Sequence, residues 1–385
     1  MKSYFTVSAL TAIACCVFLF SCKEKKADNV QHKVISNYTE IEECYDSVYF
    51  KSSIAIRLET TDECLIKEID KIMFDENRLF IFDKSLNSVF VFDMDGKFLH
   101  AVNRTGNGPG EYTDLSSVCL DVEKKQLILV PFTPLKIYYL DYDGNLLREA
   151  DRAKIWYKEI NCQDNNIYAT ILPRQGNDSC YIYAIDNDGK ERCFVEYPEV
   201  YQNTYFFDRY YMTKTKNLNF TINCENFIYE IVDDKVIKKY EIDFGKYNLP
   251  RYYVRKDIPL DEFLDAMKRE YIYSIVEVVD GDNYLAFTTN RLIPAYIYSK
   301  TEDLLTRIFK IRDSKYAFSC NQMYHIENMP NSIAFIKDAA SLLDLKDATK
   351  FWENEKWAKQ KQNLWNLTET MQFDDNPVVM IYNFR

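Results

Sequence analysis

The sequence predicts an all-β fold, a six-bladed β-propeller with two helical insertions at about 258–273 and 337–372. A hairpin motif, in which an Asp-x-Asp-Gly turn joins two apolar strands, occurs three times, with turns at 93–96, 141–144 and 186–189. These turns recur about every 45–48 residues, a period typical of propeller blades. The 30 tyrosines and 25 phenylalanines favour strands. Because one blade cannot bury both faces of its sheet, the copies must pack around a common axis.

Each turn has a physical reason for its sequence. Glycine at the fourth position tolerates the positive φ that a bulged hairpin needs. The aspartates can accept hydrogen bonds from turn amides. Oxygen-rich loops of this kind can also hold calcium, but no glutamate follows at the spacing of a full calcium loop. We therefore expect structural turns, and we predict no metal site and no cofactor.

The start of the chain predicts export. Residues 1–21 combine Lys2 with a short apolar run and read as a signal peptide. The run ends at Cys22, which we expect to carry a lipid that anchors the protein to the membrane. The alternative is a cleaved signal in which Cys22 has no role. Residues 22–49 are then expected to form a polar tether, and 50–385 the propeller domain.

The propeller elements follow in order. An early strand at 50–58 is expected to complete the last blade and so hide an open sheet edge. Strand patterns then predict six blades. The first five span about 66–102, 113–150, 155–197, 219–242 and 275–303, and the first insertion lies between the fourth and fifth. The second insertion interrupts the sixth blade, which ends with a closing strand at 377–382.

A loop rich in glycine and proline at 103–112 connects the first two blades. It does not match a nucleotide-binding loop, because no Lys-Ser or Lys-Thr pair follows it. It is either a structural turn or a possible ligand loop. In the second interpretation Arg104, Glu111 and Tyr112 are its candidate ligand-binding residues.

Cysteine and histidine give weak signals. The 11 cysteines contain no Cys-x-x-Cys pair, so a zinc site is not expected. Cys180 and Cys193 flank one hairpin as diagonal neighbours, which allows a disulfide without requiring one. The three histidines, His32, His100 and His325, are expected to be ordinary strand or loop residues rather than a metal site.

Several of these segments together resemble a known family. They are Leu58–Thr61, Ile69–Ile72, Asn87–Asp93, the loop Gly106–Tyr112 and Asp375–Val379. On these residues the chain resembles the NHL-like six-bladed β-propeller lipoproteins of Bacteroides-type bacteria. The resemblance implies an outer-membrane lipoprotein of the bacterial cell envelope, on either membrane face, and carries no catalytic residue.

Function is only partly constrained. The net charge of −11 argues against a nucleic-acid partner. We expect a binding or scaffold module for a glycan, a peptide or another envelope protein rather than an enzyme. The alternative is a carbohydrate-active hydrolase or lyase with two carboxylates at the mouth of the propeller. A mouth lined by tyrosine, asparagine and apolar groups, or plugged by helices of the second insertion, would favour binding.

Overall fold

The structure is a computed structural model, and it describes residues 32–153, 157–171, 179–198, 211–255, 258–291, 295–351 and 355–385. The chain divides into two units, residues 1–31 and 32–385. The expected signal peptide and Cys22 lie outside the described residues.

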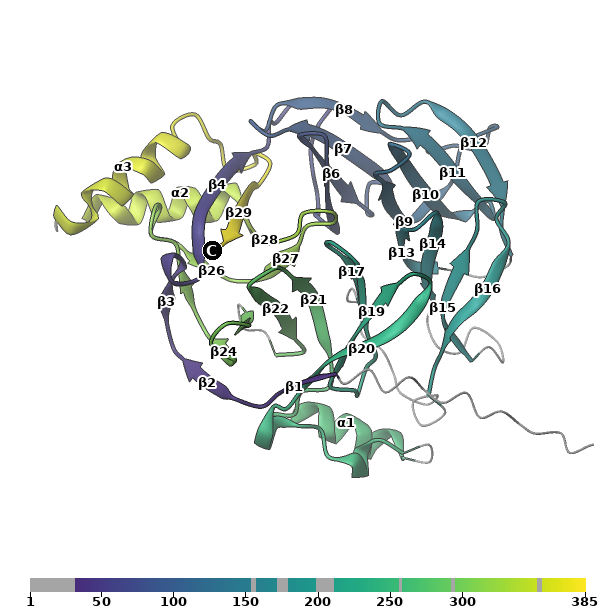
Figure 1. The fold of residues 1–385 in the computed structure, drawn as a ribbon. Helices are drawn as coiled ribbons and strands as arrows, with labels where there is room; N and C mark the ends of the chain where they lie inside the picture. Colours follow the sequence, from purple (N-terminus) through teal and green to yellow (C-terminus); the bar gives the residue numbers. More distant parts are fainter. Residues whose placement is uncertain are drawn as a thin grey trace, which may run out of the picture. The chain divides into compact units, whose positions relative to one another are not determined.

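Within the second unit, the sheets stand round a common centre (Figure 1). Three sheets are built from consecutive antiparallel strands, namely β5 (Lys71–Asp75), β6 (Arg78–Asp83), β7 (Ser88–Asp93) and β8 (Phe98–Val102); β9 (Asp114–Asp121), β10 (Gln126–Thr133), β11 (Lys136–Asp141) and β12 (Leu146–Asp151); and β13 (Tyr157–Gln163), β14 (Asn166–Ile171), β15 (Cys180–Ile185) and β16 (Glu191–Glu196).

The next two sheets each gain a fifth strand from the N-terminal segment. One contains β17 (Met212–Lys214), β18 (Leu218–Thr221), β19 (Phe227–Val232), β20 (Lys235–Ile242) and β1 (Lys33–Ile35), and the other β21 (Ile275–Asp280), β22 (Tyr284–Thr289), β23 (Ala295–Ser299), β24 (Leu304–Ile308) and β2 (Tyr38–Ile41). The last two sheets are the small β3 (Cys44–Tyr45), β25 (Ile311–Arg312) and β26 (Ser319–Cys320), and the larger β27 (Met323–His325), β28 (Ser332–Lys337), β29 (Val378–Phe384) and β4 (Phe50–Arg57).

The described residues thus form a propeller of seven blades, so the expectation of six blades is wrong. Six sheets have four or five strands, and the seventh has three strands of only two residues each. Such short strands carry no readable alternation. One of them, β3, also comes from a distant part of the chain, so no local repeat could indicate this blade.

The N-terminal segment runs along the outer edges of consecutive blades (Figure 1). β1 pairs in parallel with β20, β2 with β24 and β3 with β25, and β4 then pairs antiparallel with β29. The closing role expected for 50–58 is therefore confirmed. Residues 33–45 were expected to form part of a tether, but they are strands that cover otherwise unpaired sheet edges.

The repeated turns also set the contact between blades. Asp93 accepts hydrogen bonds from the amides of Asp95 and Lys97 at 3.0 and 2.9 Å, and Gly96 has a φ of 85°. A Cβ on Gly96 would overlap the carbonyl oxygen of Arg57 in the preceding blade. In the equivalent turns, Gly189 likewise abuts the carbonyl oxygen of Asp151 in β12, and Gly144 packs on the side chain of Val102 in β8. The glycine is thus needed both for its φ and for the close approach of the next blade.

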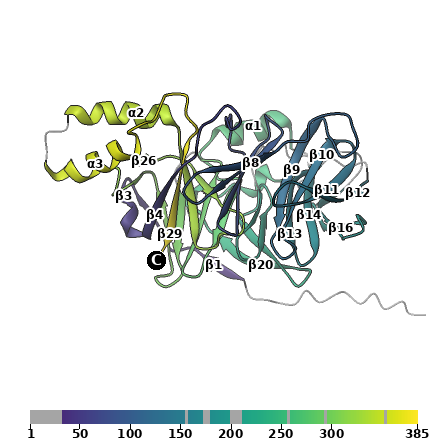
Figure 2. The ribbon, with the colours of Figure 1, turned by 90° about the horizontal axis from the view of Figure 1, so that it is seen from above.

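Both expected helical insertions are present. The first contains α1 (Leu260–Lys268), and the second contains α2 (Ala339–Ala348) and α3 (Ala358–Leu367). Asp338 caps α2 by accepting a hydrogen bond from the Ser341 amide at 2.7 Å. All three helices lie outside the ring of sheets, and α2 and α3 extend beyond it in the side view (Figures 1 and 2), so the second insertion does not plug the centre.

Two disulfides join cysteines that the sequence left open, Cys119–Cys162 between neighbouring blades and Cys180–Cys193 within one hairpin. Among the described residues, no helix is both long and apolar enough to span a membrane.

Candidate functional site

The loop at 103–112 brings its three candidate residues together, but their polar atoms serve the loop itself. Tyr112 is fully buried, and its hydroxyl donates to the Asn87 carbonyl at 3.0 Å. The Arg104 Nε donates to the Gly110 carbonyl at 2.7 Å. The Glu111 carboxylate accepts from the Gly108 amide at 2.7 Å. These contacts shape a connection between blades, and ligand binding by the loop stays a prediction.

The histidines lie far apart in the fold. His325 is buried in β27, and its Nδ1 lies 2.6 Å from a carboxylate oxygen of Glu277. His100 lies on β8 with its Nε2 2.9 Å from the Tyr142 carbonyl, and His32 contacts Glu241. Among the described residues, no group of three or more His, Cys, Asp or Glu side chains could hold a metal ion.

At the ring centre, charged side chains replace the apolar packing seen between blades. Lys71 of β5 forms an ion pair of 2.5 Å with Glu327, and both side chains are fully buried. The Lys71 ammonium also donates to the carbonyls of Val118 and Ile160, each at 3.0 Å. Glu327 accepts from the Leu120 amide at 2.9 Å. This ion pair therefore ties together inner strands of four blades.

A second buried carboxyl lies in the same region. Glu159 of β13 is 1% exposed. Burial raises the pKa of Glu159 to about 8, while the charges of Lys71 and Lys158 act in the opposite direction. Glu277 raises it further. The ring centre thus holds both signs of charge, contributed by different blades.

Above these residues lies a cavity of about 260 Å³. It is lined by the turns that follow β9, β13 and β17 and by Asn328, which follows β27; its other lining residues are Asp121, Val122, Glu123, Cys162, Gln163, Asp164, Asn165, Lys214, Thr215, Lys216 and Asn217. Three of these four blades are consecutive, and the blade that carries Asn328 is a neighbour of none of them, so the cavity lies where the inner strands converge. We call it the axial cavity.

Three hydrogen-bond donors of the axial cavity have no acceptor among the described residues. The first is the ammonium of Lys214, a residue that is only 8% exposed and makes no side-chain hydrogen bond or ion pair in the described part of the chain. The others, within the same described ranges, are the hydroxyl of Thr215, a residue 4% exposed, and the side-chain amide nitrogen of Asn328. The Thr215 hydroxyl and the Asn328 nitrogen are themselves buried and have almost no accessible surface, so they lie behind the cavity surface and do not reach its contents.

The electrostatics of Lys214 are balanced between burial and nearby acids. Burial lowers the pKa of its ammonium, and the carboxylates of Glu327, Asp121 and Glu123 act against this effect. Asp121 is partly neutralised by Lys124, at 3.3 Å. Burial is the larger effect, so the pKa of the Lys214 ammonium is lowered overall.

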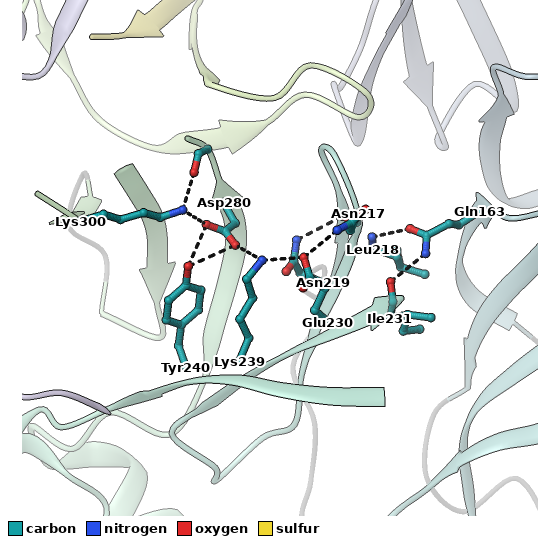
Figure 3. Close-up of polar contacts among 11 residues, drawn as sticks. Gln163, Asn217, Leu218, Asn219, Glu230, Ile231, Lys239, Tyr240, Asp280 and Lys300 are labelled. Carbon is teal, nitrogen blue, oxygen red and sulfur yellow. Dashed lines mark hydrogen bonds and ion pairs between the residues drawn. The ribbon is translucent and has the colours of Figure 1, made fainter. Parts of the chain in front are cut away.

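The cavity wall is held in place by contacts between blades (Figure 3). The Gln163 side chain accepts from the Leu218 amide at 2.6 Å and donates to the Ile231 carbonyl at 2.8 Å. The Asn217 amide donates to Glu230 at 2.9 Å. These two wall residues are thus engaged in structure, unlike Lys214.

The same network continues outward across the next blade (Figure 3). Lys239 lies 2.6 Å from Glu230 and 2.7 Å from Asp280. Asp280 also contacts Lys300 at 2.6 Å, and it accepts from the Tyr240 hydroxyl at 3.2 Å. The turn after Lys214 is therefore joined through Asn217 to a polar network that extends into the next blade.

Sequence reasoning did not find this site. Its residues come from turns of four blades and share no motif. Three carboxylates and two lysines line the cavity. Of the tyrosine, asparagine and apolar lining that we associated with binding, it has three asparagines and a valine but no tyrosine. The one available signal was Lys71, a lysine directly before the apolar residues of β5.

Solved structures confirm the fold. A Bacteroides fragilis protein, provisionally described as exported, superimposes with a TM-score of 0.68 at 17% identity, covering 92% of this chain and 100% of that chain. A member of the DUF4221 family from Bacteroides vulgatus gives 0.49 at 11% identity, covering 87% and 97%. Virginiamycin B lyase from Staphylococcus aureus gives 0.41 at 13% identity, covering 74% and 81%. At these identities the first likeness shows the fold alone, and the other two carry no further argument.

No curated protein has a significant match to the sequence. A family model described as a domain of unknown function, DUF4934, matches residues 30–383. This match includes every blade, the axial cavity and the N-terminal edge strands, so the chain belongs to the DUF4934 family.

Proposed function

We propose that this protein is a ligand-binding module of the bacterial cell envelope, held at the outer membrane by lipid on Cys22, and that its ligand occupies the axial cavity. The observation that carries the proposal is the axial cavity itself, which turns of four blades line and whose lining includes Lys214, a residue 8% exposed that makes no side-chain contact with a partner among the described residues. A ligand oxygen in the cavity would accept a hydrogen bond from its ammonium.

The size and shape of the cavity support a small polar ligand. Its volume of about 260 Å³ is several times the roughly 30 Å³ that a water occupies in the liquid. It lies slightly below the range of about 300–1,000 Å³ typical of sites for drug-sized ligands. A sugar unit or the end of a peptide fits such a concavity better than the flat surface of a folded protein does.

The test is a thermal-shift screen of the full chain against neutral sugars, uronic acids and short peptides. A ligand that binds only the native state stabilises it by about 2.7 kcal/mol when the ligand concentration is 100 times Kd. This stabilisation raises the melting temperature. We expect at least one class to stabilise the protein. Lys216→Trp, which fills the cavity from its exposed rim, should abolish the shift. Lys268→Trp on α1, outside the ring, is the matched control.

Two results would contradict the proposal. One is a stabilising ligand whose effect survives Lys216→Trp, because it would bind elsewhere. The other is cleavage of the ligand during incubation, followed by mass spectrometry, which would favour the hydrolase alternative over a binding module.

A further inference from the structure

The axial cavity offers its ligand little apolar surface. Of its lining residues, only Val122 and Cys162 are apolar, and Cys162 is held in the disulfide with Cys119. Sites for small ligands are usually lined mainly by apolar and aromatic side chains. This cavity therefore gives the apolar side chains of a peptide little to pack against, and it suits a ligand that is polar over most of its surface.

The free polar groups of the lining are of both kinds. Glu123 and Lys216 are exposed, and neither side chain makes a hydrogen bond or ion pair within the described ranges. Asp164 is also exposed, and its carboxylate accepts a hydrogen bond from the Gln163 amide at 3.2 Å through one of its two oxygens. Lys214 adds a second ammonium. Hydrogen-bond acceptors and donors thus line the same small space, on the turns after β9, β13 and β17.

A hydroxyl group matches such a surface better than other neutral groups do. It has one O–H donor and two acceptor lone pairs, so it can donate to a carboxylate and accept from an ammonium at the same time. Both of these bonds involve a charged partner and are stronger than neutral ones. A peptide group also has a donor and an acceptor, but in its trans form they point in opposite directions. Several adjacent hydroxyls, as on a sugar ring, therefore use this lining most fully.

The charges of the lining favour a ligand without a net charge. The carboxylates of Asp121, Glu123 and Asp164 oppose an anion. The ammonium groups of Lys214 and Lys216 oppose a cation. Burial also lowers the pKa of the Lys214 ammonium, which weakens its attraction for an anion. A neutral molecule with several hydroxyls uses both signs of charge as hydrogen-bond partners and is repelled by neither.

Resting on the proposed function, we infer that the ligand of the axial cavity is a neutral sugar, whose adjacent hydroxyls donate to Glu123 and Asp164 and accept from Lys214. This inference narrows the ligand class within the same cavity. It separates neutral sugars from acidic sugars, from amino sugars and from peptides.

The test is isothermal titration calorimetry on the full chain with two sets of matched sugars. One set is glucose, glucuronate and glucosamine, and the other is galactose, galacturonate and galactosamine. At about pH 6 the acids are ionised and the amines protonated, so each set changes one substituent and its charge on a common ring. Acetyl-triglycine amide serves as a neutral peptide without apolar side chains. We expect one neutral sugar to bind about tenfold more tightly than its acid, its amine and the peptide, the factor that corresponds to one hydrogen bond to a charged group.

Two variants locate the contacts. Glu123→Ala removes an acceptor from an exposed position and should weaken the neutral sugar about tenfold. Glu63→Ala, at an exposed acid outside the cavity lining, is the matched control and should change no affinity. Lys214→Met keeps the length of the side chain but removes its charge, so it should weaken the neutral sugar and strengthen the amino sugar. A merely structural role of Lys214 would weaken both sugars alike.

The outcomes separate this inference from the proposed function. An acid, an amine or the peptide that binds as tightly as the neutral sugar overturns the neutral sugar as the ligand class, and so does failure of both neutral sugars to bind at millimolar concentration. Sugar binding that Glu123→Ala leaves unchanged overturns the inference too. If Lys216→Trp abolishes the binding of a ligand from another class, the axial cavity remains the ligand site. Binding that is insensitive to Lys216→Trp overturns both.

Discussion

Lys71→Met tests whether the ion pair at the ring centre holds the blades together. The substitution preserves side-chain length but leaves the Glu327 carboxylate fully buried, with the Leu120 amide as its remaining donor among the described residues. Removing one member of a buried pair typically costs about 3–5 kcal/mol. At roughly 2 °C per kcal/mol for a domain of this size, the melting temperature should fall by about 6–10 °C.

The second variant isolates the cause. Adding Glu327→Gln to Lys71→Met removes the stranded charge, so we expect it to recover about 2 kcal/mol or more of the loss. Thermal and urea unfolding followed by circular dichroism measure both changes. Lys350→Met, in an exposed pair with Asp347, is the control and should not shift the melting temperature measurably. If the double variant loses as much free energy of unfolding as the two single variants together, the ion pair does not hold the blades together in this way.

Three further predictions address the turns, the buried acid and the membrane anchor. Gly96→Ala should destabilise the protein by about 2 kcal/mol more than Gly245→Ala in urea unfolding, because both glycines have positive φ but only Gly96 abuts a neighbouring backbone; equal costs would contradict this. The raised pKa of Glu159 means that the folded state holds its proton more tightly than the unfolded state. Wild-type stability should therefore fall as pH rises from about 4.5 to about 8 relative to Glu159→Gln, and parallel pH profiles of the two proteins would count against it. Cys22→Ser should move the protein from the membrane to the soluble fraction in cell fractionation; retention in the envelope would rule out the lipid anchor.

The blades that carry a full motif could be predicted from the sequence. The turns at Asp93, Asp141 and Asp186 combine alternating apolar strands with a glycine whose conformation is locally determined. The closing strand at 50–58 could be predicted too, because it is long and apolar enough to need a partner.

The remaining features depend on contacts that local patterns do not encode. Strands β1 to β3 are two to four residues long, and they exist because blade edges far along the chain offer them partners. The axial cavity has the same origin, since Lys214 and Asn328 meet only after the ring has closed. There the backbone amide of Asn328 donates to the backbone carbonyl of Lys214 at 2.9 Å. A single sequence contains no signal for such a meeting.

The most direct measurement is a crystal structure of the chain grown with the ligand that stabilises it most in the thermal-shift screen. We predict ligand density in the axial cavity, with a ligand oxygen within hydrogen-bond distance of the Lys214 ammonium. Density at the other end of β13, in the tyrosine-lined pocket beside Tyr181, would contradict it, as would an axial cavity that holds only water.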